Sequence, residues 1–71
     1  MTHKIPGSRL VEIPAEHIDY AKLVVERVGI VRACEVLGTS KIALLGVLAR
    51  GAAMPGTGAI LAIAYSRREA A

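Results

Sequence analysis

The stretch that decides the fold reads Gly29-Ile30-Val31-Arg32-Ala33-Cys34-Glu35-Val36-Leu37-Gly38-Thr39-Ser40-Lys41-Ile42-Ala43-Leu44-Leu45-Gly46-Val47-Leu48. Gly38 separates two apolar segments, and glycine adopts a left-handed backbone at lower cost than any other residue. Ser40 follows two residues later and belongs to the residue types preferred at helix N-caps. The stretch therefore predicts a helix over residues 30–37, a tight turn, and a second helix from Lys41 to about Arg50.

The two predicted helices also carry the side chains that a close crossing requires. Helices that cross at about 90–120° through a short turn need a small residue where their backbones approach, and Ala33 with Cys34 supplies it. Helical spacing places further apolar residues on the side where the two helices would meet. These residues are Leu37, Leu44, Val47 and Leu48.

The pattern Ala-small-x-x-Leu-Gly-x-Ser-Lys-x-x-Leu over residues 33–44 resembles the DNA-binding helix-turn-helix of small bacterial and phage regulators. Both the phage-repressor (Cro-like) type and the Fis type share it, and the segment from Gly56-Thr57 to Ile60 is also similar to repressor-like domains. In that family the second helix enters the major groove of DNA. The resemblance implies a DNA-binding site made of Arg32, Thr39, Ser40, Lys41, Ile42, Leu45 and Arg50.

The second helix departs from the family at its outward positions. Ile42, Leu45 and Gly46 stand where such regulators usually carry Gln, Asn, Arg or Thr, and Ile30 replaces a polar residue at the start of the first helix. Apolar side chains can contact thymine methyl groups but cannot make bidentate hydrogen bonds to bases, each worth about 1–3 kcal/mol of discrimination. Two interpretations follow: Lys41, the N-terminal arm and DNA shape carry the contacts, or the helix binds a protein partner.

Two further helices flank this pair. Pro14 suits the first position of a helix that ends before Gly29, with an apolar stripe of Ile18, Ala21, Val25 and Val28. Pro55-Gly56 predicts a turn, after which Thr57 caps a last helix that ends at Arg67-Arg68. The predicted fold class is all-α, with four short helices and a central helix-turn-helix.

Residues 1–13 form an extended N-terminal arm in this interpretation, and residues 14–71 form the helix-turn-helix domain. Leu10 and Val11 favour a strand, so we expect Arg9–Ile13 to pair with a second copy of the chain as one hypothesis for the arm. Lys4 and Arg9 could enter a minor groove, as homeodomain arms do, or lie in an unstructured tail.

The chain has 71 residues, of which 54% are hydrophobic, and it contains two tyrosines but no Phe or Trp. This composition excludes intrinsic disorder and predicts a core of aliphatic side chains. A membrane hairpin over residues 42–65 is a minor alternative, because Arg50 and Pro55 interrupt the apolar run. The apolar surplus comprises Ile42, Leu45, Ile60, Leu61, Ile63 and Tyr65, and such unhidden residues mark protein interfaces. We therefore expect a homodimer, formed through the surplus on the last helix.

The formal net charge of +3 resides in the second part of the chain, because acidic and basic residues balance over residues 1–28. A positive charge on residues 29–71 permits a polyanionic partner such as double-stranded DNA. His3, His17 and the single Cys34 lack partners at ligand spacing, so the sequence predicts no metal, no cofactor, no small-molecule ligand and no catalysis. We expect a cytoplasmic repressor that occludes a promoter, with a protein-binding adaptor or inhibitor as the alternative.

Overall fold

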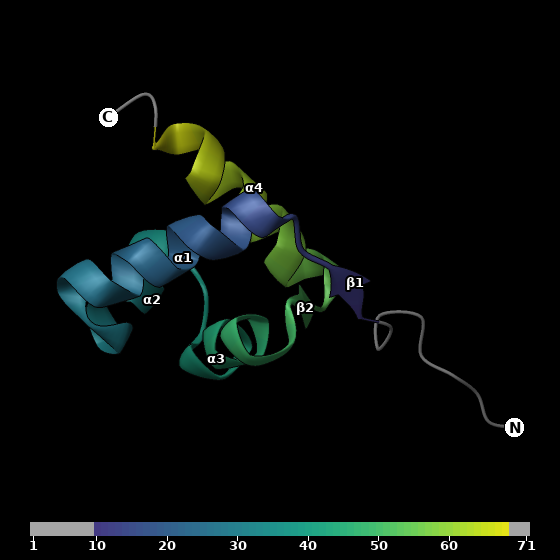
Figure 1. The fold of residues 1–71 in the computed structure, drawn as a ribbon, viewed down its shortest axis with the longest axis horizontal. Coiled ribbons are helices and arrows are strands. Elements are labelled where there is room, and N and C mark those ends of the chain that lie inside the picture. Colours follow the sequence, from purple (N-terminus) through teal and green to yellow (C-terminus); the bar gives the residue numbers. More distant parts are fainter. Residues whose placement is uncertain (1–9, 69–71) are drawn as a thin grey trace, which may run out of the picture.

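The computed structural model describes residues 10–68, in which four helices surround a small aliphatic core (Figure 1). The elements are β1 (Val11–Glu12), α1 (Ala15–Val28), α2 (Ile30–Leu37), α3 (Lys41–Arg50), β2 (Ala52–Ala53) and α4 (Pro55–Arg67). The predicted all-α class with four helices is confirmed. The two short strands form a ribbon at the end of the molecule where the chain enters the fold.

The turn between α2 and α3 has the local structure that the sequence predicts. Gly38 ends α2 with a left-handed backbone, φ 78° and ψ 27°, and its N–H donates to the carbonyl of Cys34 at 2.8 Å. Ser40 begins α3, where its hydroxyl oxygen accepts a hydrogen bond from the Ala43 N–H at 3.1 Å. Glycine thus stands where the backbone is left-handed, and serine stands where the helix needs an N-cap acceptor.

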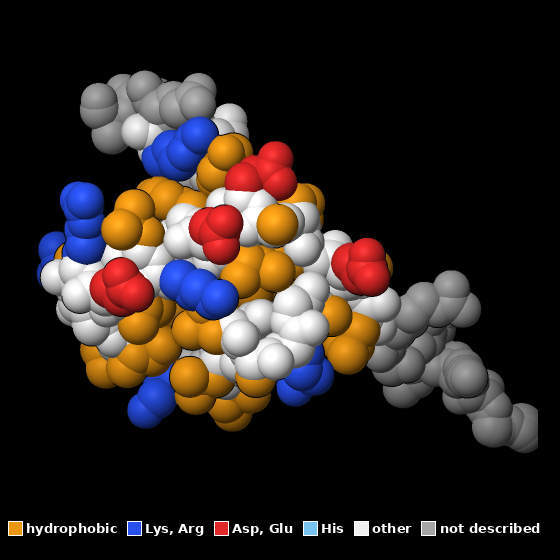
Figure 2. Space-filling view, viewed as in Figure 1, with side chains coloured by type: hydrophobic (Ala, Val, Ile, Leu, Met, Phe, Trp, Pro, Cys, Tyr) orange, Lys and Arg blue, Asp and Glu red, His pale blue; other side chains and the backbone are white. Residues whose placement is uncertain are grey.

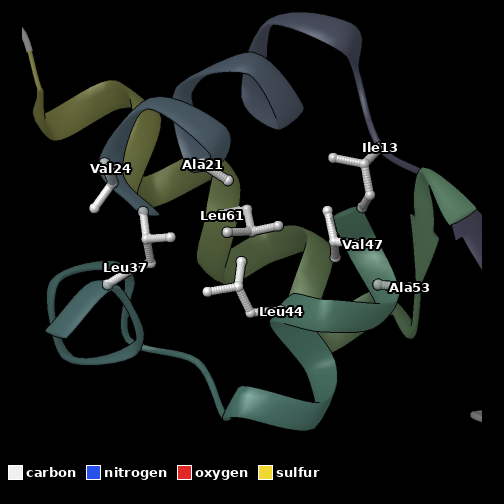
Figure 3. Packing of buried hydrophobic residues seen from close by; sticks show 9 residues of the cluster. Ile13, Ala21, Val24, Leu37, Leu44, Val47, Ala53 and Leu61 are labelled. Atoms are coloured by element: carbon white, nitrogen blue, oxygen red, sulfur yellow. The ribbon is translucent and has the colours of Figure 1, made fainter. Parts of the chain in front are cut away.

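The core is small and is closed by leucine and valine side chains from all four helices. Figure 3 shows Leu37, Leu44 and Leu61 pointing toward one another from α2, α3 and α4. These three and Val47 are the largest fully buried side chains of the described residues, and Ala21 and Ala33 are completely buried beside them. The apolar contacts predicted around the turn are confirmed, and Leu48 packs against the same cluster while partly exposed.

The described part of the N-terminal arm belongs to this fold. β1 pairs with β2 in antiparallel register, Val11 opposite Ala53 and Glu12 opposite Ala52, and the N–H of Ile13 donates to the carbonyl of Gly51 at 3.0 Å. Val11 and Glu12 thus form a strand, as Leu10 and Val11 suggested, and their partner within the chain is β2. Residues 1–9, with Lys4 and Arg9, lie outside the described residues.

Ile13, the last residue of the expected arm, contacts the helices. Its side chain is buried in the core cluster. A Cβ atom at Gly58 of α4 would lie 3.4 Å from the Ile13 Cδ1, an ordinary van der Waals distance, so Ile13 lies directly beside α4. Burial of one large aliphatic side chain contributes about 1.5–3 kcal/mol.

Two helix starts differ from the sequence prediction by a few residues. Pro14 is the N-cap of α1, with an extended ψ of 143°, and the helix itself begins at Ala15. α4 begins at Pro55 with Met54 as its N-cap, so Thr57 lies inside the first turn and does not cap the helix. Proline at the first helical position costs no hydrogen bond, which explains why the helix starts before Thr57.

The buried side of α1 includes most of the predicted stripe and extends beyond it. Ala21 is buried, Ile18 and Val25 pack against the core while partly exposed, and Val28 is exposed. Outside the stripe, Val24 is also buried and Tyr20 packs partly against the core. α1 contacts α2, α3 and α4, so its inward surface is broader than a single stripe. Within residues 10–68, no helix is both long enough and apolar enough to span a bilayer.

Candidate nucleic-acid interface

One side of α3 is left uncovered by the rest of the protein. Lys41, Ile42, Leu45 and Ala49 are exposed, and their spacing in the helix places them on a single side, here named the α3 outer face. Leu44 and Val47 occupy the opposite side and are completely buried. The packing therefore orients the helix so that a strip of one lysine and three apolar residues faces outward.

Ile42 is the most exposed large apolar residue of the described chain. Ile42 as a whole residue is 84% accessible, and Leu45 is 46% accessible. Exposed apolar side chains are common singly, but two on the same outward helix face form a surface suited to a partner. Both residues belong to the site that the resemblance implies, and the structure brings them together with Lys41.

The segment of the chain that contains α3 carries charge of one sign. Residues 36–68 contain no Asp or Glu, whereas Lys41, Arg50, Arg67 and Arg68 all lie within this segment. Along the lower edge of Figure 2, where α3 lies in Figure 1, hydrophobic side chains are flanked by basic ones and no acidic side chain lies among them. This part of the surface favours an anionic partner.

Arg32 differs from the other cations of the implied site. Its guanidinium lies 3.7 Å from the carboxylate of Glu35 one turn away on α2, and both side chains are more than two thirds exposed. Exposed pairs of this kind contribute little to stability and exchange readily with solvent or another anion. Arg32 is therefore accessible, but a local acidic partner reduces its contribution to the positive field.

The turn residues contribute mainly through backbone and capping interactions. Thr39 is half-buried, and its N–H donates to the carbonyl of Cys34 at 3.1 Å. The Ser40 hydroxyl accepts from the Ala43 N–H and keeps its own O–H available as a donor. Of these two implied site residues, only Ser40 is exposed.

Arg50 adopts a position that the sequence did not indicate. A Cβ atom placed on Gly46 would lie 2.6 Å from the Arg50 Nη2, so the guanidinium lies directly over the backbone of Gly46 one turn earlier in α3. Gly46 is buried, and the exposed Arg50 side chain lies beside it at the edge of the α3 outer face. A shallow groove of about 220 Å³ lies beside it, between the start of α3 and the start of α4, with Leu10 and Met54 in its lining.

A second uncovered surface lies between α2 and α4. This α2–α4 groove has a volume of about 460 Å³ and is lined by Tyr20, Glu35, Val36, Leu37, Gly38, Ile60, Ile63, Ala64, Arg67 and Arg68. Val36, Ile60 and Ile63 are its exposed large apolar residues. Glu35 lies on the α2 side and Arg67 on the α4 side, so the groove carries both signs of charge.

Two of the six residues expected to form the exposed apolar surplus are not exposed. Leu61 is buried in the core, because it faces Leu44 and not solvent. Tyr65 is half-buried between the ring of His17, whose centroid is 4.6 Å away, and the Arg68 guanidinium at 3.6 Å from the tyrosine centroid. Ile42, Leu45, Ile60 and Ile63 remain exposed.

Within residues 10–68 no three His, Cys, Asp or Glu side chains are arranged to hold a metal ion. Cys34 is a half-buried thiol packed against the core, and His3 lies outside the described residues. No family model, no curated protein and no solved structure matches this chain.

The contact between Arg50 and Gly46 makes a prediction about stability. Gly46→Ala should raise the free energy of unfolding by about 0.5–1 kcal/mol, because alanine favours a helix interior and only the mobile end of Arg50 must move. Thermal or urea unfolding of the two proteins measures the change. The matched control adds Gly46→Ala to Arg50→Ala, and the double variant should exceed Arg50→Ala alone by the same free energy of unfolding. If Gly46→Ala instead lowers the free energy of unfolding, Arg50 is held rigidly over Gly46 and the prediction is wrong.

Proposed function

We propose that this protein is a sequence-specific DNA-binding transcriptional regulator that acts in the cytoplasm as a homodimer, with α3 in the major groove. The single observation that carries the proposal is the α3 outer face, an uncovered helix side within a segment that contains only positive charges. The α2–turn–α3 segment gives it the order of elements expected of a helix-turn-helix. Repression by occlusion of a promoter is the mode that we propose.

The proposed docking assigns different roles to the site residues. The start of α3, with Ser40, Lys41 and Ile42, approaches the base edges, and Leu45 follows one turn later. Arg50 at the far end of α3 and Arg32 on α2 lie on separate elements and contact phosphates. The major groove is about 12 Å wide and admits one α-helix, so an uncovered helix side is the surface needed.

The α2–α4 groove supports the homodimer. A two-fold axis through this groove would bury Val36, Ile60 and Ile63 of each protomer against the same residues of its partner. The same axis would bring Glu35 of one copy toward Arg67 of the other, twice in each dimer. Because the groove does not include the outward residues of α3, a dimer formed there leaves both α3 outer faces free for half-sites about 34 Å apart.

A protein-binding adaptor or inhibitor is the second candidate function. The observation that favours it is the exposure of Ile42 and Leu45, because apolar residues at the centre of a contact surface are typical of protein interfaces. The positive charge around the α3 outer face would then select an acidic protein. DNA binding has the stronger support, because the uncovered helix follows the turn and cap pattern of the regulators that the sequence resembles.

The role of Lys41 provides the test of DNA binding. Fluorescence anisotropy with a labelled duplex, repeated between about 50 and 200 mM salt, should give an affinity that falls steeply as salt rises. Lys41→Ala should weaken binding and reduce the salt slope by about one, because one phosphate or base contact by a cation is lost.

Lys22→Ala is the matched control, since Lys22 is also exposed but lies on α1. It should leave both the affinity and the slope close to those of the unchanged protein. If no duplex binds even at the lowest salt, or if both lysine variants behave alike, the proposed DNA-binding role of α3 is wrong.

The dimer is tested by placing a charge in the α2–α4 groove. Ile63→Asp should weaken self-association by at least about ten-fold, because an unpaired carboxylate buried in an interface costs several kcal/mol. Light scattering at several protein concentrations measures the molar mass. Val31→Asp is the control, because Val31 is exposed on α2 outside the groove; an unchanged mass for Ile63→Asp would exclude this surface as the interface.

A further inference from the structure

We infer that the α3 outer face recognises the C5-methyl groups of thymine, so that the preferred ligand is duplex DNA with neighbouring thymines in the major groove. This inference rests on the proposed function and specifies the class of DNA that the same site selects. The residues that make the distinction are Ile42 and Leu45.

The first step is that α3 carries few side chains able to form hydrogen bonds. Between Lys41 and Arg50, every residue is Ala, Gly, Val, Leu or Ile, so only the two ends of the helix carry a polar side chain. The Arg50 guanidinium lies over Gly46 at the edge of the face, and the Ser40 oxygen accepts from the Ala43 N–H. The centre of the outer face therefore has no group able to make the bidentate contacts that identify guanine or adenine.

The second step is the feature of a base pair that an apolar side chain can detect. In the major groove, the four base pairs differ in donors, in acceptors and in the methyl group of thymine. Only the methyl group gains from contact with an aliphatic side chain, because both surfaces leave water together. With apolar side chains at its outward positions, α3 can therefore distinguish base pairs by their methyl groups and not by their hydrogen-bonding groups.

The third step is the spacing of the two side chains. Ile42 and Leu45 lie three positions apart in one helix, which separates their Cβ atoms by about 5–6 Å. Successive nucleotides of one strand are about 3.4 Å apart along the helix axis. The two side chains therefore span one to two base steps, which is the spacing of thymines in a short A·T-rich segment.

The fourth step is the charge that surrounds the apolar centre. Lys41 is exposed at the start of the outer face, Arg50 lies at its edge, and no acidic residue occurs from residue 36 to residue 68. A duplex presents apolar methyl groups between two rows of phosphates, which complements an apolar strip between two cations. This complementarity selects DNA as the occupant of the face.

The test compares duplexes of about two helical turns that differ only in the methyl group. Alternating dA-dT and dA-dU duplexes have the same charge and the same base pairing, and only the former carries the C5-methyl. Alternating dG-dC duplexes with and without 5-methylcytosine place the same methyl group on the other base pair. Each contacted methyl should change the affinity by about four-fold, so the dA-dT duplex should bind about four to fifteen times more tightly than the dA-dU duplex.

Variants assign the effect to α3. Ile42→Ala and Leu45→Ala should each reduce the preference for the methylated duplexes while keeping salt-dependent binding to all four. Val31→Ala is the matched control, because Val31 is also an exposed apolar residue but belongs to α2. Its preference for methylated duplexes should equal that of the unchanged protein.

The remaining outcomes separate this inference from the proposed function. Salt-dependent binding with equal affinity for dA-dT and dA-dU overturns the methyl inference and leaves DNA binding in place. A methyl preference that Ile42→Ala and Leu45→Ala do not reduce overturns the assignment to the α3 outer face. Binding to none of the four duplexes at low salt overturns the proposed function itself, and with it this inference.

Discussion

At Gly38 the backbone passes through a left-handed conformation with φ 78°, and the next two residues lead into the cap of α3. A residue with a Cβ atom would adopt this conformation at a cost of about 1–2 kcal/mol, which is a large part of the stability of so small a domain. The turn places Leu37 before it and Leu44 after it in the same core, opposite Leu61. Because α3 is anchored by Leu44 and Val47, the turn also determines which side of α3 faces outward.

This constraint explains how a chain so rich in apolar residues divides them between inside and outside. A domain of this size buries few large side chains, and here the inner positions of α2, α3 and α4 supply most of them. Ile42 and Leu45 lie on the α3 outer face, and Val36, Ile60 and Ile63 line the α2–α4 groove. The other exposed large apolar residues of the described chain lie elsewhere, at Leu10, Val11, Leu23, Val28, Val31 and Met54. The two surfaces differ in charge, because α3 lies in a segment with only basic charged residues and the groove is lined by both Glu35 and Arg67.

Local signals in the sequence were sufficient to predict the turn between α2 and α3 and the buried side of α3. Gly38, Ser40, Leu44 and Val47 all occupy the positions predicted for them, because each depends on interactions within a few residues or on helical spacing. Exposure of Lys41, Ile42 and Leu45 followed from the same spacing. Their function does not follow from spacing, since an exposed apolar side chain suits a methyl group or a protein surface equally well.

Features that depend on contacts between distant segments were not predictable in the same way. β1 has two residues, too few for a strand signal, and it forms only because β2 presents free backbone groups beside it. The buried side of α1 is set by three neighbouring helices at once, which no single stripe represents. The position of Arg50 over Gly46 depends on the missing side chain of a glycine inside a helix, where glycine usually indicates only lower helix stability.

The proposed DNA-binding role requires that α3 is the surface that contacts the duplex. Amide chemical shifts of the isotopically labelled protein, recorded by NMR during titration with an alternating dA-dT duplex, report the contacted surface residue by residue. We expect the largest changes at residues 39–45 and at Arg50, with the amides along the α2–α4 groove little affected. Changes centred on α1 or on the α2–α4 groove, with residues 39–45 unmoved, would contradict the proposed role.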